Sequence, residues 1–188
     1  MTYSKLLMYI SFVWVASEIA LGFVARSGAE ASHRDRSSLR VLWISISVSI
    51  FIGMFVSHLP IGQMPFDART LFYAGVALIA IGLMIRWTAI LTLRRYFTVD
   101  VAIRSDHVVV QRGLYRLLRH PSYAGALLSF VGLGLATGNW LTLAIIVIGS
   151  FAGFAYRIRV EEDALRDGLG AAYEEYARHT KRLIPGVY

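Results

Sequence analysis

The chain has 188 residues, of which 56% are apolar and 16% are charged, and its formal net charge is +7. Soluble domains carry about a quarter charged residues, so this composition indicates an integral membrane protein. Cysteine is absent, which excludes disulfides, iron–sulfur clusters and thiol nucleophiles, and the five histidines are scattered, so we expect no metal site.

Five apolar segments predict an all-α integral membrane protein with five transmembrane helices. They are residues 5–25, 41–59, 71–93, 122–137 and 139–156. About 20 helical residues cross the hydrocarbon core of a bilayer, so the first three segments are long enough, whereas the fourth and fifth are shorter. Gly138 and Asn139 separate the last two segments, which predicts a tight helical hairpin. The first segment is too long and too aromatic for a signal peptide, so we expect it to remain as a membrane helix.

Most lysines and arginines lie in three segments that a five-span chain places on one side of the membrane. These segments are residues 26–40, 94–121 and 157–188, whereas the other side carries Lys5 and Arg69. The positive-inside rule then predicts an N-terminus outside and a cytoplasmic tail. Because membrane topology and anionic lipids account for the basic charge, we do not expect a nucleic-acid partner.

Two charged residues, Glu18 and Arg86, lie inside predicted spans at similar depth. A salt bridge between them would relieve the cost of a charge in the membrane, which is a few kcal/mol for each residue alone. Alternatively, Arg86 extends to the interface and Glu18 lines a water-filled crevice, and the sequence leaves both arrangements open.

The connector between the third and fourth spans breaks the helical pattern. Its residues 96–112, "YFTVDVAIRSDHVVVQR", contain the β-branched runs 98–103 and 108–110 on either side of a polar turn. This pattern predicts a short β-hairpin or an extended lid at the membrane surface. Residues 114–119 are expected to form a short interfacial helix.

Pro121 is well suited to the first turn of the fourth span, because that position does not need a backbone N–H. His120 then lies beside the N-terminal N–H groups of the helix, whose positive dipole end suits a carboxylate. The plainer interpretation of "RHP" is an ordinary interfacial helix start.

The end of the fifth span carries a second polar cluster. Arg157 and Glu161 are separated by one helical turn and share a face, and Glu162 follows directly. They could form a simple surface pair. The tight hairpin, however, should bring the two glutamates to the depth of Arg119 and His120. The apolar end "LIPGVY" suggests that the charged tail packs back over this region.

Three motifs in this order resemble the isoprenylcysteine carboxyl methyltransferase family, whose superfamily includes membrane phospholipid N-methyltransferases. The motifs are "GLYRLLRHPSYAGALL", Arg-x-x-x-Glu-Glu at 157–162, and Tyr-x-x-Tyr followed by "LIP". The resemblance covers about residues 94–188, the expected methyltransferase core, which follows a three-span region at 1–93. It implies S-adenosylmethionine as methyl donor, bound on the cytoplasmic side under the C-terminal segment.

The resemblance also implies roles for particular residues. The implied donor-binding residues are Tyr115, His120, Pro121, Tyr123 and Glu162. Arg157 and Glu161 fall at the positions of the family's active-site arginine and glutamate.

The expected acceptor is a small lipophilic molecule that enters from the bilayer. A carboxylate acceptor is already ionised and needs alignment and desolvation, for which the planar Arg157 fork is suited, with Glu161 orienting it. An amine or thiol acceptor would instead need a base, for which Glu161 or His120 could serve. The residues do not decide between these acceptors, although we favour a carboxylate.

Other interpretations remain for the whole chain. A sterol-type membrane reductase would use NADPH, and a lipid-binding scaffold would need only the interfacial arginines. The glycine-rich "GLGLATG" at 132–138 lies in an apolar run, so helix packing explains it better than a Rossmann loop. The expected location is a prokaryotic inner membrane, with the site on the cytoplasmic side, and the oligomeric state is left open.

Overall fold

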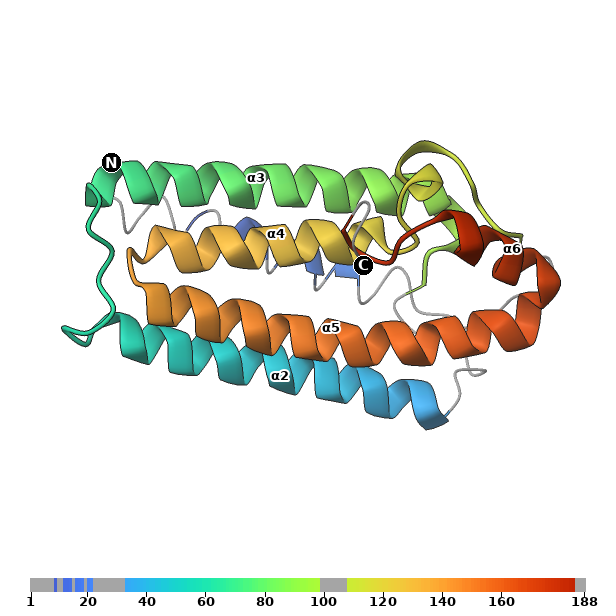
Figure 1. Ribbon diagram of the computed structural model, residues 1–188, viewed down its shortest axis with the longest axis horizontal. Helices are drawn as coiled ribbons and strands as arrows, with labels where there is room; N and C mark the ends of the chain where they lie inside the picture. Colours follow the sequence, from blue (N-terminus) through green and yellow to red (C-terminus); the bar gives the residue numbers. More distant parts are fainter. Residues whose placement is uncertain are drawn as a thin grey trace.

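The computed structural model describes residues 9, 12–14, 16–18, 20–21, 33–98 and 108–184, and within them it is helical, with no β-strand. Four long helices run side by side: α2 (His33–Ser57), α3 (Ala68–Leu93), α4 (Pro121–Ala136) and α5 (Trp140–Leu169) (Figure 1). A shorter helix, α6 (Ala171–His179), lies at one end of this bundle with the 3-10 turns η1 (Arg94–Tyr96) and η2 (Gly113–Arg116).

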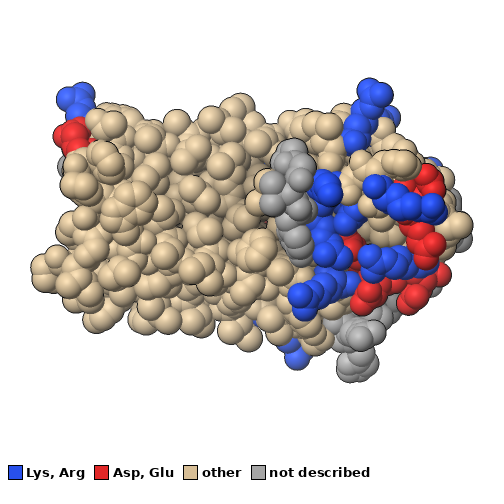
Figure 2. Space-filling view, in the orientation of Figure 1, with Lys and Arg blue, Asp and Glu red and all other residues tan. Residues whose placement is uncertain are grey.

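The helices have the length and surface of a membrane protein. Three of them are long and apolar enough to cross a membrane, and α4, with 16 residues, is shorter. Figure 2 shows charged side chains gathered at the α6 end, a few at the opposite end, and an uncharged belt between them. Large apolar side chains such as Phe51, Phe55 and Ile148 are exposed on this surface. The protein is therefore a multi-pass integral membrane protein, while the five spans and their orientation stay predictions.

Glycines bring α3 and α4 into close backbone contact. A Cβ on Gly75 would lie 2.5 Å from the Gly132 carbonyl oxygen, and one on Gly82 would lie 2.5 Å from that of Gly125. Small residues allow this approach, which stabilises helix pairs in membranes through van der Waals contact. The packing interpretation of the 132–138 glycines is thereby supported.

The hairpin between α4 and α5 is as tight as the sequence predicts. Gly138 adopts a positive φ of 67°, and Asn139 caps α5 by accepting hydrogen bonds from the backbone N–H groups of Leu141 and Thr142. The Asn139 amide also donates to the Ile61 carbonyl at 2.7 Å. This bond joins the hairpin to the α2–α3 loop, so all four long helices are held together at this end.

The ion pair between Glu18 and Arg86 is confirmed. Arg86 Nε and Nη2 each donate to one carboxylate oxygen of Glu18 at 2.6 Å, and Nη1 donates to Ser122 Oγ at 2.9 Å. The two-pronged geometry satisfies both charges and ties the first apolar segment to α3 and α4.

Some predicted boundaries are wrong. α2 begins at His33 and not near residue 41, and α5 continues to Leu169, because charged residues are compatible with a helix that extends beyond the apolar stretch. Residues 114–119 do not form a helix: the 3-10 turn ends at Arg116, and the backbone that follows pairs with residues 181 and 182. The predicted hairpin at 96–112 lies mostly outside the described residues.

Candidate active site

A cavity lies at the charged end of the bundle. At this end α3 ends and α4 begins (Figure 1). Apolar side chains from the end of α3 and from residues 96–98 and 108–110 form one part of its wall. Polar side chains from η2, the start of α4 and the last turns of α5 form another part, and two tyrosines of α6 complete it. Helices from four parts of the chain therefore position a single site.

Arg157 and Glu161 on α5 both line this cavity. The Arg157 side chain is almost completely buried, with 1% of the residue exposed, and its Nη1 donates to Ser38 Oγ on α2 at 2.5 Å. Glu161 is partly exposed and accepts a hydrogen bond from the Tyr123 hydroxyl at 2.8 Å. The same hydroxyl also meets the Arg157 guanidinium, so Tyr123 links the two charged groups. Arg157 is thus not the simple surface residue of the plainer interpretation.

His120 is the N-cap residue of α4, and Pro121 occupies the first turn as predicted. The histidine ring stacks on Tyr123, with 5.6 Å between ring centroids and 12° between planes. Its Nδ1 lies 3.8 Å from Glu161 Oε2, and its Nε2 lies 3.4 Å from Glu162 Oε1. The predicted meeting of His120 with the two glutamates is therefore confirmed.

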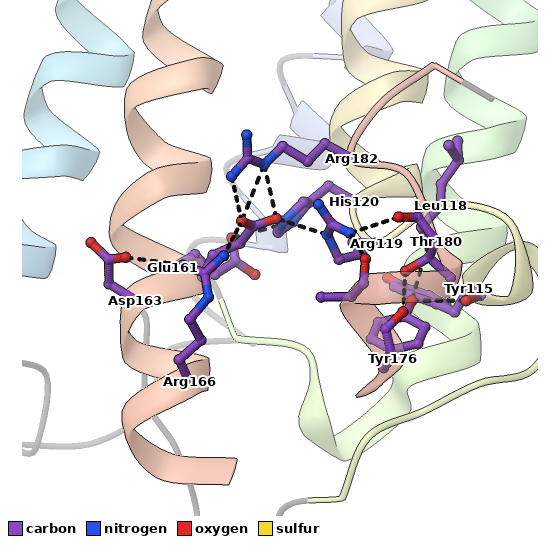
Figure 3. A network of polar contacts seen from close by, with 12 residues as sticks. Tyr115, Leu118, Arg119, His120, Glu161, Asp163, Arg166, Tyr176, Thr180 and Arg182 are labelled. Carbon is purple, nitrogen blue, oxygen red and sulfur yellow. Dashed lines mark hydrogen bonds and ion pairs between the residues drawn. The ribbon is translucent and has the colours of Figure 1, made fainter. Parts of the chain in front are cut away.

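Glu162 is fully buried, and three arginines that Figure 3 labels, Arg119, Arg166 and Arg182, converge on its carboxylate. Its carboxylate accepts hydrogen bonds from Arg119 at 2.8 Å, from Arg182 at 2.8 Å and from Arg166 at 3.1 Å. A buried carboxylate requires such compensation. Because these arginines come from different segments, Glu162 joins α5 to the start of α4 and to the C-terminal segment.

The C-terminal segment packs back over the site, as the apolar ending suggested. The backbone N–H of Arg119 donates to the Lys181 carbonyl at 2.7 Å, and that of His120 donates to the Arg182 carbonyl at 3.1 Å. Leu183 is buried, and Arg119 Nη1 also donates to the Thr180 carbonyl at the end of α6 (Figure 3). Residues 180–183 therefore hold in place the segment that leads into α4.

The tyrosines of η2 and α6, Tyr115, Tyr173 and Tyr176, also line the cavity. Burial raises the pKa of Tyr176 to about 12, and burial also raises the pKa of Tyr115 and of Tyr173. The three hydroxyls therefore stay protonated in neutral solution. The Tyr176 hydroxyl donates to the Tyr115 carbonyl at 2.8 Å.

Five of the seven predicted site residues line the cavity, namely Tyr115, His120, Tyr123, Arg157 and Glu161. Pro121 and Glu162 are not among the lining residues in the described part of the chain. The wall also contains Arg119, Ser122 and Leu165, which sequence reasoning did not assign to the site. Arg119 could have been found, because it directly precedes His120, whereas nothing in the sequence distinguishes Ser122.

The chain is similar to a known protein family. Residues 75–167 match the model of the isoprenylcysteine carboxyl methyltransferase (ICMT) family. The predicted family resemblance is confirmed. The chain is 36% identical over 115 residues to protein-S-isoprenylcysteine O-methyltransferase B of Arabidopsis thaliana, with 60% of this chain and 58% of that protein covered. It is 38% identical over 115 residues to protein-S-isoprenylcysteine O-methyltransferase of Saccharomyces cerevisiae, with 60% and 48% covered.

A solved structure is also similar to this chain. The eukaryotic intramembrane Ras methyltransferase ICMT superposes with a TM-score of 0.59 and 28% sequence identity, covering 84% of this chain and 55% of that one. The chain thus spans less than two thirds of the length of these proteins. All of them are eukaryotic, so they give no support to the predicted prokaryotic inner membrane.

Proposed function

We propose that this chain is an integral membrane methyltransferase that transfers a methyl group from S-adenosylmethionine to the carboxylate of a lipophilic, isoprenylcysteine-type acceptor. One observation carries this proposal: a single cavity joins the buried Arg157 of α5 to the polar start of α4 and to the tyrosines of α6. Such a cavity can take a lipophilic acid from the bilayer and a polar donor from the aqueous side. The similarity to protein-S-isoprenylcysteine O-methyltransferases supports the same reaction.

The cavity wall fits the proposed donor. One buried atom on it, the Tyr173 hydroxyl, has no hydrogen-bond partner among the described residues, and the ring of His120, whose Nε2 faces the Glu162 carboxylate at 3.4 Å, also lines the cavity. Buried polar atoms are nearly always satisfied, so the Tyr173 hydroxyl points to a polar ligand. When bound, S-adenosylmethionine supplies a methyl group on a sulfonium: an acceptor oxygen bonds to the methyl carbon, and the carbon–sulfur bond breaks with its electron pair left on sulfur.

We assign acceptor binding to Arg157 and its orientation to Glu161 through Tyr123. The guanidinium is planar and permanently charged, so it can hold a carboxylate by two parallel hydrogen bonds. Its burial removes water from that contact, which strengthens the attraction and frees the acceptor oxygen from hydration. A carboxylate needs no proton removed, so neither Glu161 nor His120 has to act as a base.

We assign donor binding to His120, Tyr115, Tyr123 and Tyr173. His120 lies at the positive end of α4, where it can meet the donor's carboxylate. The tyrosine rings offer apolar faces and protonated hydroxyls to the rest of the donor. For Glu162, which is buried and does not line the cavity in the described part of the chain, the arginine contacts favour a role in fixing Arg119 and His120 over the direct donor contact that the resemblance implies.

The proposal places residues 94–188 as the methyltransferase core, with the cavity on the cytoplasmic side of five spans. Cysteines introduced singly at Ser37 and Ser105 should then react only with reagent on the cytoplasmic side, and a cysteine at Gln63 only from outside. Reaction of the Gln63 variant from the cytoplasmic side would overturn the five-span orientation.

The experiment that tests the function uses the purified protein in lipid nanodiscs. Calorimetry should detect binding of S-adenosylmethionine but not of NADPH. Methyl transfer to N-acetyl-S-farnesylcysteine should yield a base-labile methyl ester, whereas the corresponding amide should accept no methyl group. Binding of NADPH alone would favour a reductase, and binding of neither cofactor would favour a lipid-binding scaffold.

A further inference from the structure

The relative position of α2 and α5 is set by close contacts along their length. Gly149 on α5 lies against Ser49 on α2, where an added Cβ would collide, and Gly153 packs tightly against Leu42 and Ser45. Ser45 Oγ donates to the Gly149 carbonyl at 2.6 Å, which fixes how the two antiparallel helices are aligned. Two turns further toward the charged end, this alignment brings Ser38 opposite Arg157.

Ser38 is completely buried, with 0% exposed, and its hydroxyl accepts a hydrogen bond from Arg157 Nη1 at 2.5 Å. Arg157 lines the cavity, whereas Ser38 is not among the lining residues in the described part of the chain. The serine therefore acts on the site through the arginine, and α2 contributes to a site otherwise formed by later parts of the chain.

We propose that Ser38 is a positioning residue that holds the Arg157 guanidinium in the orientation needed to bind the acceptor's carboxylate. This inference rests on the proposed function of Arg157. An arginine side chain has several rotatable bonds, and a fixed partner for one of its nitrogens restricts the plane of the whole group. A serine hydroxyl does this without adding negative charge, so it does not compete with an incoming carboxylate as a glutamate partner would.

The test compares Ser38→Ala with a matched control, Ser49→Ala. Ser49 is also buried on the α5-facing side of α2, but its hydroxyl donates to the Ile46 carbonyl of its own helix. Both variants lose one buried hydroxyl from the same helix, so they should lose similar thermal stability. A third variant, Ser38→Thr, keeps the hydroxyl and should restore most of the binding preference for the acid that Ser38→Ala loses.

The readout is equilibrium binding of N-acetyl-S-farnesylcysteine and of its amide, in nanodiscs containing S-adenosylhomocysteine. Ser38→Ala should reduce the preference for the acid over the amide about tenfold, since one hydrogen bond that orients a charged group is lost. Its affinity for S-adenosylhomocysteine, measured first, should stay within about twofold of the parent, which also shows that the variant is folded.

The outcomes separate this inference from the function on which it rests. The positioning role is wrong if Ser38→Ala keeps the parent's preference for the acid. It is also wrong if Ser49→Ala reduces that preference as much as Ser38→Ala does. A parent protein that binds acid and amide equally also overturns it. Absence of methyl transfer by a parent that still prefers the acid would refute the proposed function and leave the positioning role intact.

Discussion

Two arginines lie within the helical bundle, and their surroundings differ. Arg86 on α3 is held by the carboxylate of Glu18 in a two-pronged ion pair, with 11% and 17% of the two side chains exposed. Arg157 on α5 is 1% exposed, donates to the hydroxyl of Ser38, and lines the cavity. Arg86 is not among the cavity-lining residues in the described part of the chain.

We propose that this difference separates a structural charge from a functional one. A charge in a membrane is energetically costly. An opposite charge on another helix offsets this cost, and the resulting ion pair holds the two helices together, as at Arg86. A charge that faces a cavity is placed to meet a ligand that brings its own charge, as we propose for Arg157. We therefore expect substitutions at Arg86 to change stability and substitutions at Arg157 to change activity.

The largest expected effect is that of Arg157→Lys on turnover. Lysine keeps the charge but loses the planar fork, so the acceptor is misaligned, and such a loss can reduce kcat about a hundredfold. Affinity for S-adenosylhomocysteine should remain, because the donor is bound by other residues. Methyl transfer and calorimetry on the same preparation measure both quantities, and full turnover by Arg157→Lys would make this arginine an interfacial anchor.

The second prediction concerns the Glu18–Arg86 pair. Glu18→Ala leaves the Arg86 charge uncompensated within the bundle, which should cost about 3 kcal/mol of stability and lower the melting temperature. The double variant Glu18→Leu with Arg86→Met removes both charges and should recover most of that loss. Thermal unfolding in detergent measures the change. Equal instability of the single and double variants would contradict the assignment of this pair to structure.

The third prediction separates the two halves of the cavity. His120→Ala should weaken S-adenosylhomocysteine binding about tenfold, because the imidazole ring that lines the cavity beside Tyr123 and is proposed to meet the donor is removed. The preference of the His120 variant for an acid over an amide acceptor should change little, whereas that of Arg157→Lys should fall. Unchanged donor affinity in the His120 variant, measured by calorimetry, would show that the donor does not contact this ring.

Hydropathy and single motifs were sufficient to predict much of this arrangement. The apolar runs predicted the long helices, "RHPSY" predicted the start of α4, and the separation of Arg157 from Glu161 by one turn placed both on one face. The short hairpin then required that these residues meet His120. Each of these inferences uses residues close in sequence or a connection of fixed length, which is why they could be made.

The remaining contacts depend on how distant segments are aligned, which no local pattern specifies. Ser38 meets Arg157 because glycines and serines set the position of α2 along α5, and many alignments of two apolar helices are compatible with the same hydropathy. The convergence of Arg119, Arg166 and Arg182 on Glu162 depends likewise on the path of the C-terminal segment. The sequence contains many arginines and does not indicate which of them share one carboxylate.

The smallest expected effect is that of Ser122→Ala, and it tests whether the two arginines are independent. Ser122 accepts a hydrogen bond from Arg86 and also lines the cavity, so it connects the ion pair to the site. If Arg86 is purely structural, losing this bond should cost about 1 kcal/mol of stability and change kcat less than about threefold. Thermal unfolding and methyl transfer on one preparation measure both. A fall in kcat as large as that of Arg157→Lys would instead show that the Glu18–Arg86 pair shapes the start of α4 for catalysis. Both arginines would then serve catalysis, and they would differ only in their distance from the acceptor.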